Sequence, residues 1–161
     1  IQWLINSGFE VRPHLLQSYW VDTGKMEDIL AANCQVLASL APRIEPSARI
    51  SADSVLQGAV AVEAGAEVLG SVVRGPAIIG ERARLVNAYV GPFSSVSHDV
   101  VVDSSEIEYC IVLEHSRIMH VASRIEASLI GRYAEVYAST QKPHGHTLML
   151  GDYSKVGLWN G

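Results

Sequence analysis

The amino-acid sequence predicts a mainly β fold: a parallel β-helix of hexapeptide repeats from about Ile44 to Val136, preceded by a short α/β segment with one helix. Two observations predict the β-helix, namely an aliphatic residue at every sixth position and a small residue two positions before it. A third observation, apolar residues spaced by three and four before Pro42, predicts the helix. We therefore divide the chain into residues 1–41 and residues 42–161.

The α/β segment is expected to contain a helix end, an extended stretch, a turn and a second, longer helical stretch. Ile1–Gly8 reads like the end of a helix that a glycine stops, which suggests a piece of a longer protein. Phe9–Val21 looks extended and is expected to supply a strand. Asp22–Gly24 forms a turn. Lys25–Leu40 is the predicted helix, since its apolar residues recur at helical spacing: Met26, Ile29, Leu30, Val36, Leu37 and Leu40.

The six-residue repeat begins after Pro42 and continues with slips of one residue. Its aliphatic positions are Ile44, Ile50, Leu56, Val62, Val68, Val73, Ile79, Leu85, Val90, Val96, Val102, Ile107, Leu113, Ile118, Ile125, Ile130 and Val136. From Ile50 on, the residue two positions earlier is Ala or Ser in thirteen of sixteen cases, the exceptions being Val60, Val100 and Ile111.

Strand geometry explains this pattern. Residues two apart in a strand point to the same side, so both repeat positions are expected to point inward. The aliphatic residue fills the interior, and the small residue lets the chain turn a corner. Three hexads close one triangular coil of about 18 residues, and the coils stack at a strand spacing of about 4.8 Å. The strands of a β-sandwich would instead alternate with a period of two.

Two interruptions of the repeat are visible. His115–Ser123 carries a slip and a short insertion, and Tyr137–Thr147 loses the repeat and is expected to be a loop. Leu148–Val156 is predicted to add a last strand that covers the open end of the β-helix.

Composition excludes several classes of function. The net charge is −5 and no Lys or Arg cluster occurs, which disfavours nucleic-acid binding. No apolar run is long enough to span a membrane, and the first residues do not read as a signal peptide. Cys34 and Cys110 lie in apolar stretches without metal-ligand spacing, so we expect two reduced thiols in a cytoplasmic protein.

The stretch Tyr19–Asn33, which contains Trp20-Val21-Asp22-Thr23-Gly24, resembles a motif of sugar-1-phosphate nucleotidylyltransferases. More narrowly, it is similar to glucose-1-phosphate thymidylyltransferases of the long form, which carry a C-terminal β-helix. Arg74–Gly80, Glu106–Leu113 and Ser128–Arg132 also look like that family. The resemblance implies that the β-helix is left-handed, against the usual right-handed crossover. It also implies that the parent enzyme converts dTTP and glucose 1-phosphate into dTDP-glucose and pyrophosphate.

The resemblance further implies that Asp22 is one of two carboxylates that hold a Mg²⁺ ion, which prefers oxygen ligands. The alternative is that Asp22 or Thr23 caps the following helix. The family's Gly-rich GxGTRL-like loop, the second carboxylate and the catalytic lysine are absent, and Lys25 reads as a solvated side chain. No catalytic residue is therefore assigned in this fragment, and the chain alone is expected to lack turnover.

Six histidines leave two other functions open. His98 lies 17 residues before His115, close to one coil, and His120 lies five residues after His115. The three histidines suggest a zinc site like that of left-handed β-helix carbonic anhydrases, although the spacing differs from that family's. His144 and His146 suggest a hexapeptide-repeat acyltransferase, whose base is a histidine, although they lie outside the repeat.

The β-helix is also expected to serve assembly or regulation, with a homo-oligomer formed through its stacked coils. Five arginines are expected on its outside, where an anionic effector could dock or where they simply favour solubility: Arg43, Arg49, Arg74, Arg82 and Arg84.

Overall fold

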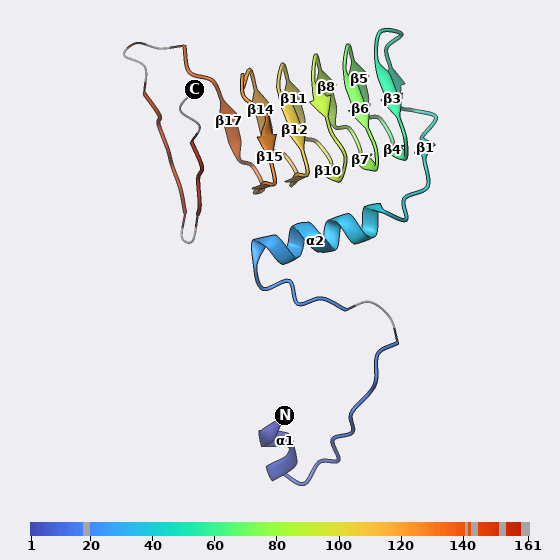
Figure 1. The fold of residues 1–161 in the computed structure, drawn as a ribbon, viewed down its shortest axis with the longest axis vertical. Helices are drawn as coiled ribbons and strands as arrows, with labels where there is room; N and C mark the ends of the chain where they lie inside the picture. The colour runs from blue at the N-terminus through green and yellow to red at the C-terminus, as the bar shows by residue number, and fades with distance from the viewer. Residues whose placement is uncertain (18–19, 141, 143–144, 152–153, 159–161) are drawn as a thin grey trace.

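The structure, a computed structural model, describes every residue except 18–19, 141, 143–144, 152–153 and 159–161. Its main body is the left-handed parallel β-helix that the repeat and the family resemblance predict, with coils stacked side by side along one axis (Figure 1). Three parallel sheets form its faces. Because each strand is followed by a corner, a strand pairs with the third strand before it and the third strand after it.

The first sheet contains β1 (Arg43–Ile44), β4 (Val60–Val62), β7 (Ala77–Ile79), β10 (Ser94–Val96), β13 (Ile111–Val112) and β16 (Leu129–Ile130). The second contains β2 (Arg49–Ile50), β5 (Glu67–Leu69), β8 (Arg84–Val86), β11 (Val101–Asp103), β14 (Arg117–Met119) and β17 (Glu135–Tyr137). The third contains β3 (Val55–Gln57), β6 (Val72–Arg74), β9 (Tyr89–Val90), β12 (Glu106–Glu108) and β15 (Ile125–Glu126).

The strand register explains the core. Val62 pairs with Ile79, and Ile79 pairs with Val96, so the aliphatic side chains of successive coils stack directly on one another. In the middle coils these side chains have no exposed surface or almost none. A stack of short strands therefore buries a continuous apolar column that no single coil could bury. Ile44, in the first coil, is 54% exposed, and Ser123, in the insertion, is exposed while Val121 packs against the core. Elsewhere the arrangement confirms the inward direction predicted for the repeat, except in one strand.

The exception lies in β13, where the prediction placed Leu113 and Ile111 inward. The residue that pairs with Val96 is instead Val112, which is fully buried, and Cys110 takes the small-residue position. Leu113 lies just beyond the strand and is half-buried. Because Ile111, Val112 and Leu113 are all aliphatic, hydrophobicity alone does not fix the phase here, whereas the pairing of β10 with β13 does.

The small residues also have a polar task. Corners bring backbone amides into the interior, where an unpaired N–H is costly. The Ser54 hydroxyl accepts a hydrogen bond from the Ser71 amide at 3.1 Å, and the Ser71 hydroxyl accepts one from the Ala88 amide at 3.0 Å. Ser105 accepts one from the Val121 amide at 3.0 Å in the same way. Serine thus serves a corner both by its size and by its oxygen.

The α/β segment contains two helices, α1 (Gln2–Asn6) and α2 (Met26–Leu37), where one full helix was expected. Gly8 follows α1 with a φ of +81°, which confirms the glycine stop. The strand expected within Phe9–Val21 is absent from its described residues, because no neighbouring strand offers them backbone partners. The division of the chain at residue 41 stays a prediction.

Helix α2 lies along the outer face of the first sheet (Figure 1). Asn33 donates a hydrogen bond from Nδ2 to the Phe93 carbonyl at 3.0 Å and accepts one from the Ser95 hydroxyl at 2.5 Å. Leu30 and Leu37 are buried on the same helix. These contacts join the α/β segment to a part of the β-helix that lies about 60 residues later in the sequence.

The end of the chain differs from the prediction. No strand forms among the described residues of Leu148–Val156, since they make no ladder pairing with the last coil. Leu148, Met149 and Leu150 are exposed there. Within the described part of the chain, no helix combines the length and the hydropathy needed to cross a membrane.

Candidate functional site

The Asp22 turn precedes α2 and is exposed to solvent. Its Oδ1 accepts a hydrogen bond from the Gly24 amide at 3.1 Å, which is an Asx turn. Helix α2 begins two residues later, with Lys25 as the N-cap residue and no capping side chain. The expectation that Asp22 or Thr23 caps the helix is therefore wrong, because the turn is completed before the helix begins.

The same turn allows a test of the magnesium assignment. A Mg²⁺ site commonly uses one or two carboxylates together with waters and substrate phosphates. Asp22 offers such an oxygen, but within the described ranges no group of three or more His, Cys, Asp or Glu side chains includes it. This chain by itself therefore presents one ligand for the ion and does not form the site.

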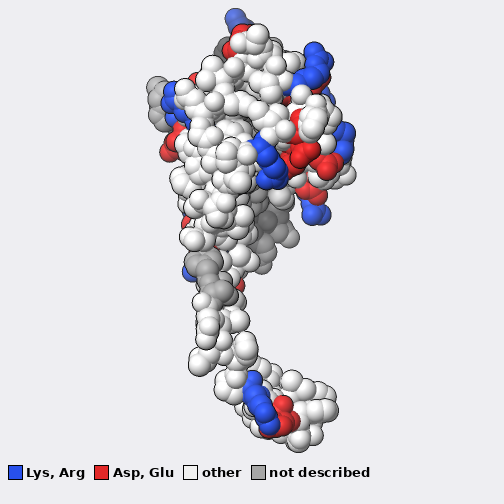
Figure 2. Space-filling view, turned by 90° about the vertical axis from the view of Figure 1, so that its right-hand side faces the viewer, with Lys and Arg blue, Asp and Glu red and all other residues white. Residues whose placement is uncertain are grey.

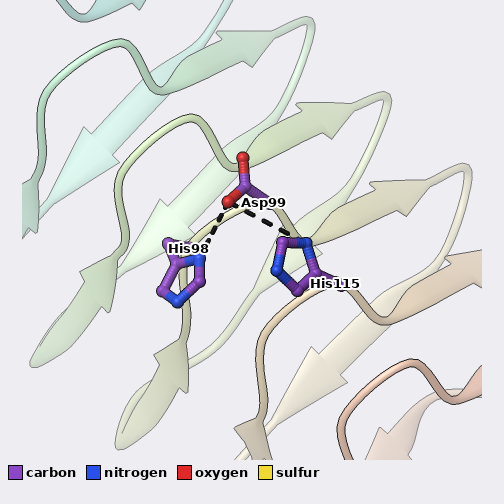
Figure 3. A group of neighbouring side chains, drawn as sticks. All are labelled: His98, Asp99 and His115. Carbon is purple, nitrogen blue, oxygen red and sulfur yellow. Dashed lines mark hydrogen bonds and ion pairs between the residues drawn. The ribbon is translucent and has the colours of Figure 1, made fainter.

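The histidines converge at a different place. His98 and Asp99 lie at the corner after β10, and His115 lies one coil further on, at the corner after β13. Figure 3 shows both imidazole rings turned toward the Asp99 carboxylate. His98 Nδ1 lies 2.8 Å from Asp99 Oδ2, and His115 Nδ1 lies 3.9 Å from the same oxygen. Of the described residues, these three alone form a group with metal-ligand geometry.

Arg82, one coil earlier, completes this cluster. Its Nε and Nη2 donate to Asp99 Oδ1 and Oδ2 at 2.8 and 2.7 Å, which is a bidentate pair. The Arg82 hydrogen bond and the one from His98 hold the pKa of Asp99 well below its usual range. Asp99 is thus a carboxylate throughout the physiological pH range.

Corner geometry explains why these residues lie together. Arg82, Asp99, His115 and Tyr133 have φ values of 54°, 57°, 60° and 56°, and Gly65 occupies the same corner at 67°. We call these five positions the corner column. Each of its four later members donates its backbone N–H to a carbonyl near the preceding corner, as Arg82 does to Ala64 at 3.0 Å. Asp and His are among the residues that tolerate positive φ, so the column has a structural reason to contain them.

The predicted zinc triad is only partly assembled. His98 and His115 come together, with their ring centroids 5.2 Å apart, and His115 stacks on Tyr133 at 4.9 Å. His120 lies at a different corner, with a φ of 56°, and is not in the cluster. Asp99 was not among the predicted ligands, although its spacing of 17 residues from Arg82 matches one coil.

The histidines proposed for acyl transfer are not brought to this cluster. His146 is exposed beyond the last strand, and His144 lies outside the described residues. A groove of about 540 Å³ does border the cluster on the first sheet, and its lining includes Ile78, Ser95, His98 and Leu113.

Most of the outward arginines are paired with carboxylates. Arg43 pairs with Glu63, Arg49 and Arg84 both pair with Glu67, and Arg82 pairs with Asp99. Arg74 lies over the Tyr89 ring at 5.8 Å. The pairs mostly link neighbouring coils, and carboxylates already compensate these cations, which disfavours the docking of an anionic effector.

Comparison with known proteins shows what the chain is similar to. A glucose-1-phosphate thymidylyltransferase of Streptomyces griseus is 46% identical over 158 residues, which cover 98% of this chain and 44% of that protein. The corresponding protein of Streptomyces antibioticus is 42% identical over the same shares. No protein-family model matches the chain.

The matched region is the C-terminal part of these relatives, so the chain spans about 44% of the length of the curated relatives it matches. Among solved structures, a hexapeptide transferase family protein from Anaplasma phagocytophilum is 19% identical, with a TM-score of 0.43 over 71% of this chain and 82% of that one. The chain is thus homologous to the β-helix-bearing part of glucose-1-phosphate thymidylyltransferases.

Proposed function

We propose, from this homology, that the chain is the C-terminal part of a sugar-1-phosphate nucleotidylyltransferase that converts dTTP and glucose 1-phosphate into dTDP-glucose and pyrophosphate. The observation that carries the proposal is the 46% identity over 98% of the chain. The nucleoside triphosphate and the sugar phosphate are the partners of the whole enzyme, Mg²⁺ is its cofactor, and the cytoplasm is its location.

In this reaction the phosphate of the sugar attacks the α-phosphate of the nucleotide and pyrophosphate leaves. Positioning and charge neutralisation supply most of the catalysis in such transfers. Asp22 would contribute one oxygen ligand to a Mg²⁺ ion, which would neutralise phosphate charge when bound. The Asx turn supports this role, because the Gly24 amide donates to one oxygen of the Asp22 carboxylate and so orients it.

The α/β segment supports the view that a larger catalytic part belongs beside it. Trp3, Leu15 and Trp20 are 71%, 89% and 70% exposed, and Phe9 is 59% exposed. On the face that Figure 2 shows, charged side chains gather on the β-helix, and few lie on the narrow N-terminal part. An apolar surface of this kind normally packs against protein. We assign it to the remainder of the catalytic domain.

The β-helix serves assembly in this proposal. Helix α2 lies along the outer face of the first sheet, so the outer faces of the second and third sheets are the contact surfaces that we assign to assembly. Stacked coils make a rigid surface on which identical subunits associate.

The test uses the full-length protein with dTTP, glucose 1-phosphate and Mg²⁺, and it measures pyrophosphate release. Asp22→Asn is expected to lower turnover by roughly a hundredfold or more and to shift the Mg²⁺ dependence to higher concentration, as expected when a metal-binding carboxylate is lost. Asp28→Asn, on the first turn of α2, is the matched control. Wild-type turnover in the Asp22 variant would end the metal role, and no pyrophosphate from the wild-type enzyme would end the proposed reaction.

A further inference from the structure

We propose that His98, Asp99 and His115 bind a divalent transition-metal ion at the corner column. This site is separate from the Asp22 turn and does not rest on the proposed nucleotidyl transfer. It is built entirely from described residues on two adjacent coils of the β-helix.

The geometry of the three ligand atoms carries the proposal. All three atoms lie within 4.8 Å of one another. Around a tetrahedral ion with bonds of about 2.0–2.1 Å, neighbouring ligand atoms are about 3.3 Å apart. The two contacts to Asp99 Oδ2 are 2.8 and 3.9 Å, one shorter and one longer than that value. Small side-chain rotations therefore bring the three atoms to bonding distance of one ion.

The backbone supports these positions. Asp99 and His115 occupy the same corner of adjacent coils, and the His115 amide donates to the His98 carbonyl at 3.3 Å. The imidazole planes of His98 and His115 cross at 85° (Figure 3). The Tyr133 ring stacks on His115 with the centroids 4.9 Å apart, which restricts the His115 ring. The ligands are thus held by a rigid corner rather than by a flexible loop, as a metal site requires.

The donor set selects the class of ion. Two imidazole nitrogens and one carboxylate oxygen suit Zn²⁺, Co²⁺, Ni²⁺ or Fe²⁺, whereas Mg²⁺ and Ca²⁺ prefer oxygen alone. Three protein ligands leave at least one position open. The side chains of His98, Asp99 and His115 are 44%, 27% and 39% exposed, so water reaches that position.

Arg82 limits the affinity of the site and offers its sharpest test. Its guanidinium occupies one lone pair on each Asp99 oxygen and places a positive charge beside the ion. The same contact orients the carboxylate, as second-shell groups do. Arg82→Gln removes the positive charge but keeps a hydrogen-bond donor, so it is expected to lower the dissociation constant for the metal. If the Arg82–Asp99 pair serves only to stabilise the fold, the same substitution should leave metal binding unchanged.

The experiment titrates the metal-free, untagged protein with Zn²⁺ by calorimetry and with Co²⁺ by visible absorption. One ion per chain is expected, with Co²⁺ bands of low-coordinate geometry. His98→Gln and His115→Gln should each weaken binding by roughly tenfold or more, as the loss of a ligand requires. His120→Gln, at another positive-φ corner, should leave binding unchanged.

Circular dichroism of each variant checks that the β-helix is intact, and a variant that fails this check is replaced by the corresponding Asn variant. No binding to the wild-type protein below about 100 μM, or equal binding by the His98, His115 and His120 variants, would overturn the proposal. Absence of pyrophosphate release would leave the metal titration unaffected, so the two proposals fail separately.

Discussion

Truncation of Val112 tests the register of the β-helix where the repeat and the structure disagree. Val112 is fully buried and pairs with Val96, whereas Leu113, which the repeat places inward, is half-buried beside a groove. If the structure is right, the smaller truncation, Val112→Ala, costs more stability than the larger one, Leu113→Ala.

The magnitudes follow from burial. Val112→Ala removes two methyl groups from the core, which costs about 1.6 kcal/mol in transfer free energy at about 0.8 kcal/mol per group. The cavity that remains adds to this cost, giving about 2–3 kcal/mol in total. Leu113→Ala leaves no closed cavity, because solvent already reaches the side chain, and its cost is expected to be about 1 kcal/mol or less.

Urea denaturation followed by far-ultraviolet circular dichroism measures both costs as shifts of the unfolding midpoint at an unchanged slope. Ile118→Val, a milder change at the next buried aliphatic residue along the chain, gives an internal standard of about 0.5–1.5 kcal/mol. A larger loss for Leu113→Ala than for Val112→Ala would show that the register assigned to β13 is wrong.

Three further predictions concern close approach, thiol burial and helix docking. Gly80→Ala should destabilise the protein by about 1–3 kcal/mol, because a Cβ there would lie 2.6 Å from the Ser97 carbonyl carbon. The control Gly131→Ala should cost far less, since nothing lies within 4 Å of a Cβ there. Equal urea midpoints for the two variants would contradict this prediction. Burial raises the pKa of the Cys110 thiol, so a thiol reagent at pH 8 should modify Cys110 only after unfolding. The free energy of unfolding should fall as pH rises past the ordinary thiol range, because the thiol ionises first in the unfolded chain. Rapid labelling of both cysteines in the folded protein would refute this prediction. Asn33→Ala should cost about 1–3 kcal/mol of stability and speed proteolysis of the segment before α2, since the Phe93 carbonyl and the Ser95 hydroxyl lose their partner. Gln35→Ala is the control. An unchanged cleavage rate in the Asn33 variant would count against the docking of α2.

The repeat made most of the fold predictable because strand geometry converts a six-residue period directly into inward-facing side chains. Ile79, Leu85 and Ile107 are fully buried as expected. The phase failed in the insertion, where Ser123 is exposed, and at β13, where three aliphatic residues follow one another and hydropathy is uninformative. Cys110 was the missed signal, since it is small enough for the corner position otherwise filled by Ala or Ser.

The α/β segment was less predictable for a different reason. Helical spacing identified α2. The start of the helix depends on whether the Asp22 carboxylate accepts a hydrogen bond from Gly24 or from a later amide, and these two local hydrogen bonds compete. The strand expected within Phe9–Val21 would have needed a neighbour, and a strand's existence depends on that partner more than on its own residues.

The candidate site was half predictable. His98 and His115 are seventeen residues apart, one coil, which the sequence suggested before their contact was known. Asp99 and Arg82 belong to the same column, but charged residues at this spacing are common on the outside of the coils, and nothing in their type marks convergence. His120 was included wrongly because proximity along the chain carried more weight than the identity of the corner.

The corner column has an evolutionary consequence. A single codon change at one corner sets the new side chain directly beside those one coil before and after it, without altering the buried core. Chemically diverse ligand sets are thus reachable by a few independent substitutions, and each intermediate remains folded. A stack of coils of this kind can therefore acquire and lose small-ligand sites at its corners while its buried core is left undisturbed.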